Sequence, residues 1–90
     1  MNLLITGVSG HLGQVVVRRL MEHNPFGRTV GIDRVRPTVL GPAHFIEADL
    51  RQIDIGELLV INDIQVVLHL ASVGGQAGIE LDQDMVRRML

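Results

Sequence analysis

Residues 6–13 read Thr-Gly-Val-Ser-Gly-His-Leu-Gly, and this stretch decides the fold. Its three glycines stand three residues apart. The apolar run Leu3-Leu4-Ile5 leads into it and is typical of a fully buried parallel strand. A helical repeat of apolar positions follows it. The order of strand, glycine turn and helix predicts the first unit of an α/β fold.

The three glycines suit a turn that binds a diphosphate, each for a different reason. Gly7 can take a tight turn off the strand at no steric cost. Gly10 lacks a Cβ, so the backbone can approach a phosphate, and Gly13 lets the helix pack close to the sheet. The free N–H groups of the first helical turn then point at the phosphates, with the positive end of the helix dipole behind them. Because glycine is common in turns, an ordinary strand-to-helix turn without a ligand stays open as the alternative.

A second apolar strand ends in Asp33. This acid lies about 20 residues after Gly13, the spacing at which dinucleotide-binding folds place a ribose-binding carboxylate. A carboxylate there can accept hydrogen bonds from both adenosine ribose hydroxyls and would repel a 2′-phosphate, which favours NAD over NADP. The next residue, Arg34, could instead reach a 2′-phosphate and favour NADP, or stack on the adenine. Asp33 could also simply form a turn at the strand end.

The glycine pattern T-G-x-x-G-x-x-G resembles that of the extended short-chain dehydrogenase/reductase family, the NAD-dependent epimerase/dehydratase group. Three further segments resemble the family in the right order. Ile32-Asp33-Arg34 is similar to the end of its second strand, and Glu47-Ala48-Asp49-Leu50 to the acidic and apolar pair after its third. Val67-Leu68-His69-Leu70-Ala71-Ser72 resembles its fourth-strand segment. The family usually has an aromatic residue where this chain has His11.

The resemblance implies a role for each matching position. Backbone N–H groups of His11 and Leu12 would contact the diphosphate, and Asp49 would bond the adenine amino group. The segment after the fourth strand would lie beside the nicotinamide half of the cofactor. The residues expected to bind NAD, or less favourably NADP, are Gly7, Gly10, His11, Leu12, Gly13, Asp33, Arg34, Asp49, Leu50, Leu70, Ala71 and Ser72.

Turn residues and hydrophobic periodicity divide the chain into its elements. Strands are predicted at Asn2–Thr6, Arg28–Asp33, Ala43–Ala48 and Gln65–Leu70. Helices are predicted at His11–His23, from Asp54 to about Asp63, and at Leu81–Leu90, with loops at Val35–Pro42 and Gly74–Gly78. In the first helix the buried stripe is expected to be Leu12, Val15, Val16 and Leu20.

Strands separated by helices or long loops imply right-handed crossovers and a parallel sheet. With the family's strand order, the fold class is α/β: a Rossmann-like three-layer half-domain with a sheet of about four strands in the order 3-2-1-4. Residues 1–90 are expected to form one such domain, a truncated part of a longer fold or a natural miniature of it.

The family's catalytic residues have no counterpart here. Its chemistry needs a Tyr as acid/base and a Lys four residues later, but the chain has no Tyr and all eight of its basic residues are Arg. We therefore assign no catalytic residue and expect the 90 residues alone to be inactive.

Composition narrows the partners. A net charge of −2 gives no electrostatic reason to expect nucleic acid. Without cysteine there are no disulfides or thiolate metal sites, which fits a reducing cytoplasm. The four histidines include no pair at helical spacing, so no metal site is expected, and His69 is interpreted as a satisfied core polar group. The first strand begins at Asn2 and no apolar run is long enough for a membrane span, so neither a signal peptide nor a membrane anchor is expected.

Three functions stay open from the sequence. The first is the cofactor-binding portion of an epimerase/dehydratase-type oxidoreductase, acting on a nucleotide sugar when complete. The second is a non-catalytic dinucleotide-binding or sensing module. The third is a small self-associating α/β domain. In the family a fifth strand covers the fourth, so without it we expect the strand at 65–70 to lie at a sheet edge and to require a homo-oligomeric partner or the missing C-terminal half.

Overall fold

The computed structural model describes residues 1–71. Its elements are β1 (Leu3–Thr6), α1 (His11–Glu22), β2 (Thr29–Asp33), β3 (Ala43–Glu47), α2 (Ile55–Ile61) and β4 (Val66–His69). They confirm the strands and helices predicted for this part of the chain, with bounds that differ by a residue or two. Ser72, the loop predicted at 74–78 and the helix predicted at 81–90 lie outside the described residues.

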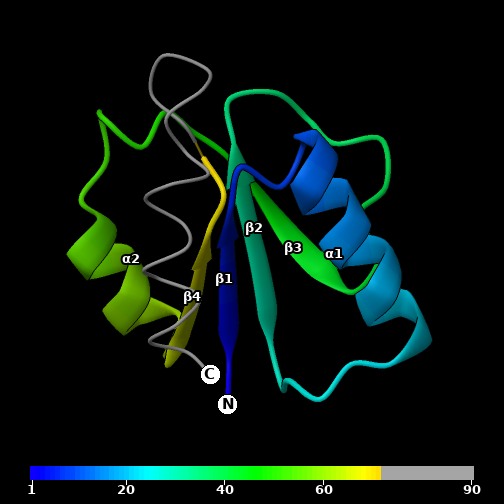
Figure 1. The fold of residues 1–90 in the computed structure, drawn as a ribbon. Coiled ribbons are helices and arrows are strands. Elements are labelled where there is room, and N and C mark those ends of the chain that lie inside the picture. Colours follow the sequence, from blue (N-terminus) through cyan, green and yellow to red (C-terminus); the bar gives the residue numbers. More distant parts are fainter. Residues whose placement is uncertain (72–90) are drawn as a thin grey trace.

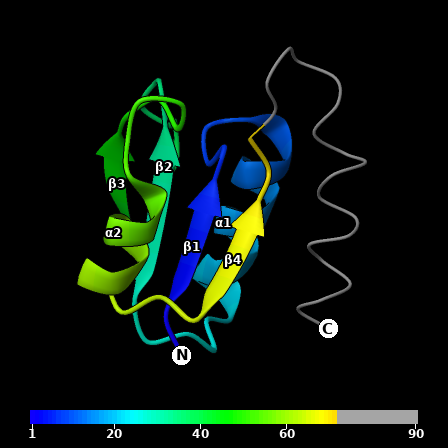
Figure 2. The same cartoon turned by 90° about the vertical axis from the view of Figure 1, so that its left-hand side faces the viewer.

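The four strands form one parallel sheet in the order β3-β2-β1-β4 (Figure 1). This confirms the predicted order 3-2-1-4. Helix α1 covers one face of the sheet and α2 covers the other, as the two views in Figures 1 and 2 show together. From β1 the chain first adds β2 and β3 on one side of β1, and it then crosses over to add β4 on the other side. The direction of strand addition therefore reverses between β1 and β4. Open α/β sheets bind ligands at such a point, beyond the carboxyl ends of the strands.

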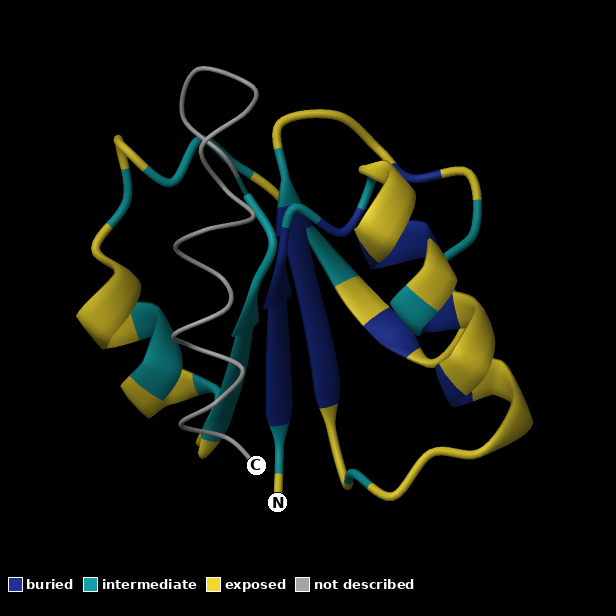
Figure 3. Cartoon of the chain, viewed as in Figure 1, coloured by how far each residue is buried: buried dark blue, intermediate teal, exposed yellow. Residues whose placement is uncertain are grey.

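The core is aliphatic and lies against the two central strands, β1 and β2 (Figure 3). Side chains of β1 alternate between two buried clusters. Leu3 and Ile5 pack on the α1 side with Val17 and Leu20. On the α2 side, Leu4 packs with Val30 and Ile32. Strand β4 is only half-buried along its length, and within residues 1–71 it pairs with β1 alone.

The predicted buried face of α1 is confirmed in part: Leu20 is buried and Val16 packs against the core, but the face is rotated by part of a turn. The buried positions are Gly13, Gln14, Val17 and Leu20, whereas Leu12 and Val15 are 48% and 42% exposed. A Cβ at Gly13 would overlap the backbone of Gly7 and Val8, so the helix turns its glycine side toward the sheet. Hydropathy gives no reason to bury a glycine or a glutamine, and it therefore placed Leu12 and Val15 in the stripe instead of Gly13, Gln14 and Val17.

The segment between β2 and β3 contains no helix or strand, as predicted. A buried side chain of α1 holds it in place. The Gln14 amide nitrogen donates to the carbonyl oxygens of Val8 and Val39, both at 2.9 Å. Its oxygen accepts from the Val39 N–H at 2.9 Å. Gln14 thus ties the glycine turn, the helix and the β2–β3 loop together.

Candidate functional site

The glycine turn between β1 and α1 needs glycine at its first position. Gly7 has φ +72°, a conformation that other residues rarely adopt. A Cβ there would lie 2.6 Å from the Ala71 backbone nitrogen, at the end of β4. The Gly7 N–H donates to the Ile32 carbonyl at 2.9 Å, so the turn is also fixed to β2.

Gly10 is different, because the fold does not require it. It is the N-cap of α1 with ordinary extended dihedral angles, φ −74° and ψ 174°. Among residues 1–71, a Cβ at this position would contact only the Gly7 carbonyl oxygen, at 3.3 Å, a close contact that needs a shift of a few tenths of an ångström. The space beside Gly10 is therefore open, and an added side chain would fill the region in front of the first turn of α1. That turn has no side-chain cap and no acidic residue, which leaves the positive end of the helix uncompensated at His11 and Leu12.

The Asp33 carboxylate is bound to the glycine turn. One carboxylate oxygen accepts from the Ser9 N–H at 3.0 Å, and the other accepts from the Arg34 N–H at 2.7 Å. The Ser9 hydroxyl donates to the Val35 carbonyl, which adds a second link between the turn and the end of β2. Each Asp33 oxygen retains acceptor capacity, since a carboxylate has about four lone-pair sites.

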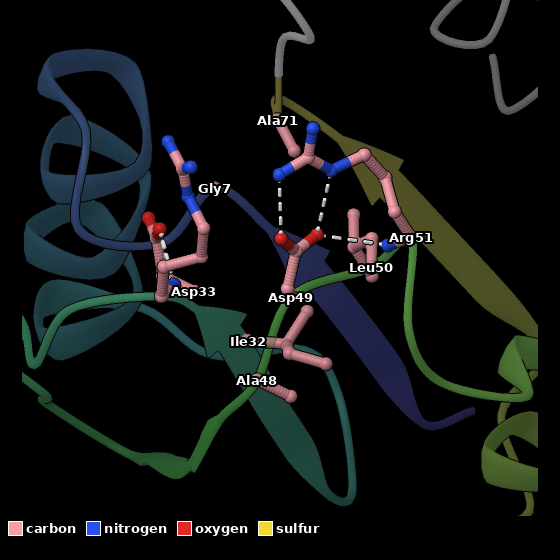
Figure 4. A pocket seen from close by; sticks show the side chains of 9 residues that line it. Gly7, Ile32, Asp33, Ala48, Asp49, Leu50, Arg51 and Ala71 are labelled. Atoms are coloured by element: carbon pink, nitrogen blue, oxygen red, sulfur yellow. Dashed lines mark hydrogen bonds and ion pairs between the residues drawn. The ribbon is translucent and has the colours of Figure 1, made fainter.

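Asp49 follows β3 and is paired within its own loop (Figure 4). The Arg51 guanidinium donates to both of its oxygens, Nε to Oδ1 at 3.1 Å and Nη2 to Oδ2 at 2.7 Å. The Arg51 backbone N–H also donates to Oδ1, at 2.9 Å. The side-chain hydrogen bonds from Arg51 are the main reason that the pKa of Asp49 falls from 3.8 to about 2, followed by the backbone bond.

A pocket opens between these carboxylates at the carboxyl edge of the sheet (Figure 4). Six of the predicted site residues line it: Gly7, Asp33, Arg34, Asp49, Leu50 and Ala71. Ile32, Ala48 and Arg51 line it as well and were not predicted. Arg51 could have been suspected from the sequence, because an arginine two residues after an aspartate in a short loop can reach back to it. Gly10, His11, Leu12 and Gly13 belong to the adjoining turn and helix start, and Leu70 is not part of the lining.

The end of β4 is held against β1 by a hydroxyl. Thr6 Oγ1 accepts from the N–H groups of Leu70 and Ala71 at 3.1 and 3.3 Å. It also lies 2.6 Å from Nδ1 of His69. With both lone pairs in use, the hydroxyl donates its proton to His69, which places the imidazole proton on Nε2. His69 is hydrogen-bonded as predicted, and the contact sets where Leu70 and Ala71 lie beside Gly7.

Two other features are absent from residues 1–71. Within this range no group of His, Asp and Glu side chains is arranged to hold a metal ion. No helix of the described range is long and apolar enough to cross a membrane.

Comparison with known proteins decides the family. Residues 3–88 match the sequence profile of the NAD dependent epimerase/dehydratase family. The chain belongs to this family. A Methanocaldococcus jannaschii protein, provisionally named as a UDP-glucose 4-epimerase, is 30% identical over 74 residues. The alignment covers 78% of this chain and 24% of that protein.

Solved structures of family members share the fold. MoeE5, in complex with UDP-glucuronic acid and NAD, is 28% identical with a TM-score of 0.68, over 83% of this chain and 24% of its own. The UDP-glucuronic acid 4-epimerase from Bacillus cereus, in complex with NAD, is also 28% identical with a TM-score of 0.63. That match covers 91% of this chain and 30% of the epimerase. The matched region thus spans 24% to 30% of the length of these relatives.

Proposed function

We propose that the chain binds NAD and forms the cofactor-binding portion of an epimerase/dehydratase-type oxidoreductase that acts on a nucleotide sugar. The observation that carries the proposal is the convergence of three features at one edge of the sheet. These are the open space beside Gly10, the uncapped start of α1 and the Asp33 carboxylate bound to the Ser9 N–H. The first two suit a diphosphate, and the third suits the ribose next to it.

The residues at this edge of the sheet suit both the diphosphate and the adenosine of the cofactor. The diphosphate would lie on the turn formed by Gly7, Gly10 and Gly13 and bond the N–H groups of His11 and Leu12. Asp33 would accept from the ribose hydroxyls through its remaining lone pairs, and would disfavour a 2′-phosphate. Arg34, Asp49 and Leu50 would surround the adenine.

The nicotinamide half of the cofactor would extend toward the end of β4. Leu70 and Ala71 are fixed there by Thr6, and Ser72 follows them in sequence. Bound NAD would supply a hydride acceptor at this end. The residues present bind and orient the cofactor, while the acid/base chemistry requires side chains that these 90 residues lack, since they include neither Tyr nor Lys.

The same absence supports a second candidate, a non-catalytic dinucleotide-binding module. The module and the enzyme would have the same cofactor site, but only the enzyme would also need acid/base residues next to it. A Tyr-x-x-x-Lys segment brought to the site by further chain or by a partner favours the enzyme, and binding without any such segment favours the module.

Backbone amide shifts on addition of NAD test the binding site directly. We expect the shifts in a two-dimensional nitrogen–proton spectrum to gather at residues 7–13, 33–34 and 49–51. Amides on the outer face of α2, such as that of Val60, serve as the internal control because they lie away from the pocket. Shifts centred on α2, or none at millimolar NAD, would refute the proposal.

A further inference from the structure

The Asp49–Arg51 pair makes three hydrogen bonds at a position where the guanidinium is largely exposed. The carboxylate side chain is 18% exposed and the guanidinium side chain is 62% exposed. An arginine held in this fork geometry loses rotamer entropy, and an exposed ion pair returns little stability for it. The pair sits on the wall of the pocket, with Leu50 between its two members in sequence. Its position therefore points to the ligand rather than to the fold.

The hydrogen bonds leave the two carboxylate oxygens unequal. Asp49 Oδ1 accepts twice from Arg51, from its backbone N–H and from Nε. Oδ2 accepts once, from Nη2. An oxygen of a carboxylate has about two acceptor sites, so Oδ1 is saturated and Oδ2 keeps one free. The fork thus leaves Asp49 with a single oriented acceptor.

We propose that Arg51 is a positioning residue: it fixes Asp49 so that Oδ2 selects a base carrying an exocyclic amino donor over a base carrying a carbonyl oxygen at that position. The inference rests on the proposed function, in which the adenine lies in this pocket. Adenine offers an N–H donor to the carboxylate, whereas hypoxanthine offers an oxygen that the carboxylate repels. Arg51 acts through Asp49 and does not itself contact the base.

The ionisation of Asp49 is not what Arg51 supplies at neutral pH. The pKa of about 2 and the ordinary value of 3.8 both leave the carboxyl charged there. Loss of Arg51 would free the carboxylate to rotate and would expose both oxygens to water. The predicted effect is therefore on orientation, and the pKa serves as a separate readout of whether the pair persists in solution.

Calorimetric titration of two dinucleotides tests the selection. NAD and nicotinamide hypoxanthine dinucleotide are titrated into the parent chain and into three variants, Arg51→Gln, Arg51→Lys and Arg19→Gln. The last is the matched control, since Arg19 is an exposed arginine on α1 with one ion pair, to Glu22 at 3.7 Å. The parent and Arg19→Gln should bind NAD about tenfold more tightly than the hypoxanthine analogue, the worth of one hydrogen bond to a charged group.

The Arg51→Gln variant should lose most of its preference for NAD, because its affinity for NAD should fall while its affinity for the hypoxanthine analogue stays the same. Arg51→Lys keeps the positive charge but lacks the planar guanidinium. It should therefore retain only part of the preference for NAD over the hypoxanthine analogue. In parallel, the Asp49 carboxyl carbon followed by NMR should titrate near pH 2 in the parent. Its midpoint should rise toward the ordinary value in Arg51→Gln.

The outcomes separate this inference from the function on which it rests. An equal loss of affinity for both dinucleotides in Arg51→Gln would mean that Arg51 binds the dinucleotide itself. An unchanged preference for NAD would mean that Asp49 needs no positioning by Arg51. An ordinary Asp49 midpoint in the parent would also overturn the inference. Failure of the parent to bind NAD would instead overturn the proposed function, and the selection with it.

Discussion

Gly7 and Gly10 stand in one turn for different physical reasons. At Gly7 the backbone has a positive φ and the end of β4 leaves no room for a Cβ. At Gly10 the dihedral angles are ordinary and the neighbouring space is open. The first glycine is therefore required by the fold, whereas we propose that the second keeps room for the diphosphate. This contrast can be tested with two substitutions in the same turn.

We predict that Gly10→Val abolishes measurable NAD binding and lowers stability by at most about 1 kcal/mol, the cost of a poor N-cap. The valine side chain would occupy the space proposed for the diphosphate. Gly7→Ala is the companion variant and should cost more than about 2 kcal/mol from strain and overlap. Calorimetry and denaturant unfolding measure both quantities. Undiminished NAD binding by Gly10→Val would show that the turn has only a structural role.

At the scale of elements, the sequence predicted the strands, the helices and their order well. Continuous apolar runs identified β1 and β2, and the Asp54 cap, which accepts from the Glu57 N–H at 3.1 Å, marked the start of α2. The buried face of α1 was predicted only in part, at Val16 and Leu20, because contact at Gly13, not side-chain hydropathy, orients the helix. The roles of Gln14 and Arg51 were missed for a related reason. Gln14 bonds backbone groups and Arg51 bonds a residue of its own loop, and the spacing of residues in the sequence predicts neither kind of contact.

Gln14→Ala should destabilise the chain by about 2–3 kcal/mol, because it leaves the backbone groups of Val8 and Val39 without their partner. It should also loosen the β2–β3 loop, which hydrogen exchange at the Val39 amide would report. Gln52→Ala is the control, since Gln52 is exposed in the loop after β3. A change in the free energy of unfolding below about 0.5 kcal/mol for Gln14→Ala would show that water replaces the amide.

At the scale of the whole molecule, the feature that matters is the outer edge of β4. In residues 1–71 the strand β4 has β1 as its one neighbour, and its outward edge carries no Pro or Lys to discourage pairing. A chain of this length also buries a modest share of its surface, about 60%, which leaves little stability to spare.

We predict that the isolated 90-residue chain self-associates at low micromolar concentration, with a symmetric dimer as the simplest closed form. Pairing of two β4 edges would satisfy their unpaired backbone groups. Multi-angle light scattering across a dilution series measures the mass. A monomer with a cooperative thermal melt at every concentration would contradict the prediction, and the chain would then be a self-sufficient miniature.

The 90 residues alone should show no oxidoreductase turnover, because no Tyr or Lys is present to transfer a proton. Conversion of UDP-sugars in the presence of NAD, followed by chromatography, is the assay, because epimerisation or dehydration returns the hydride and leaves no net reduction of NAD. Formation of a new nucleotide sugar at a rate that scales with protein concentration would require an acid/base group other than the family's and would refute this prediction.

Comparison of NAD with NADP tests whether the glycine turn and Asp33 form an NAD site. Both cofactors are titrated into the chain by calorimetry at one ionic strength, so that screening of the 2′-phosphate is the same in each experiment. We expect NAD to bind at least about tenfold more tightly than NADP, since the Asp33 carboxylate would accept hydrogen bonds from the free ribose hydroxyls and would repel a 2′-phosphate. Equal or tighter binding of NADP would contradict it.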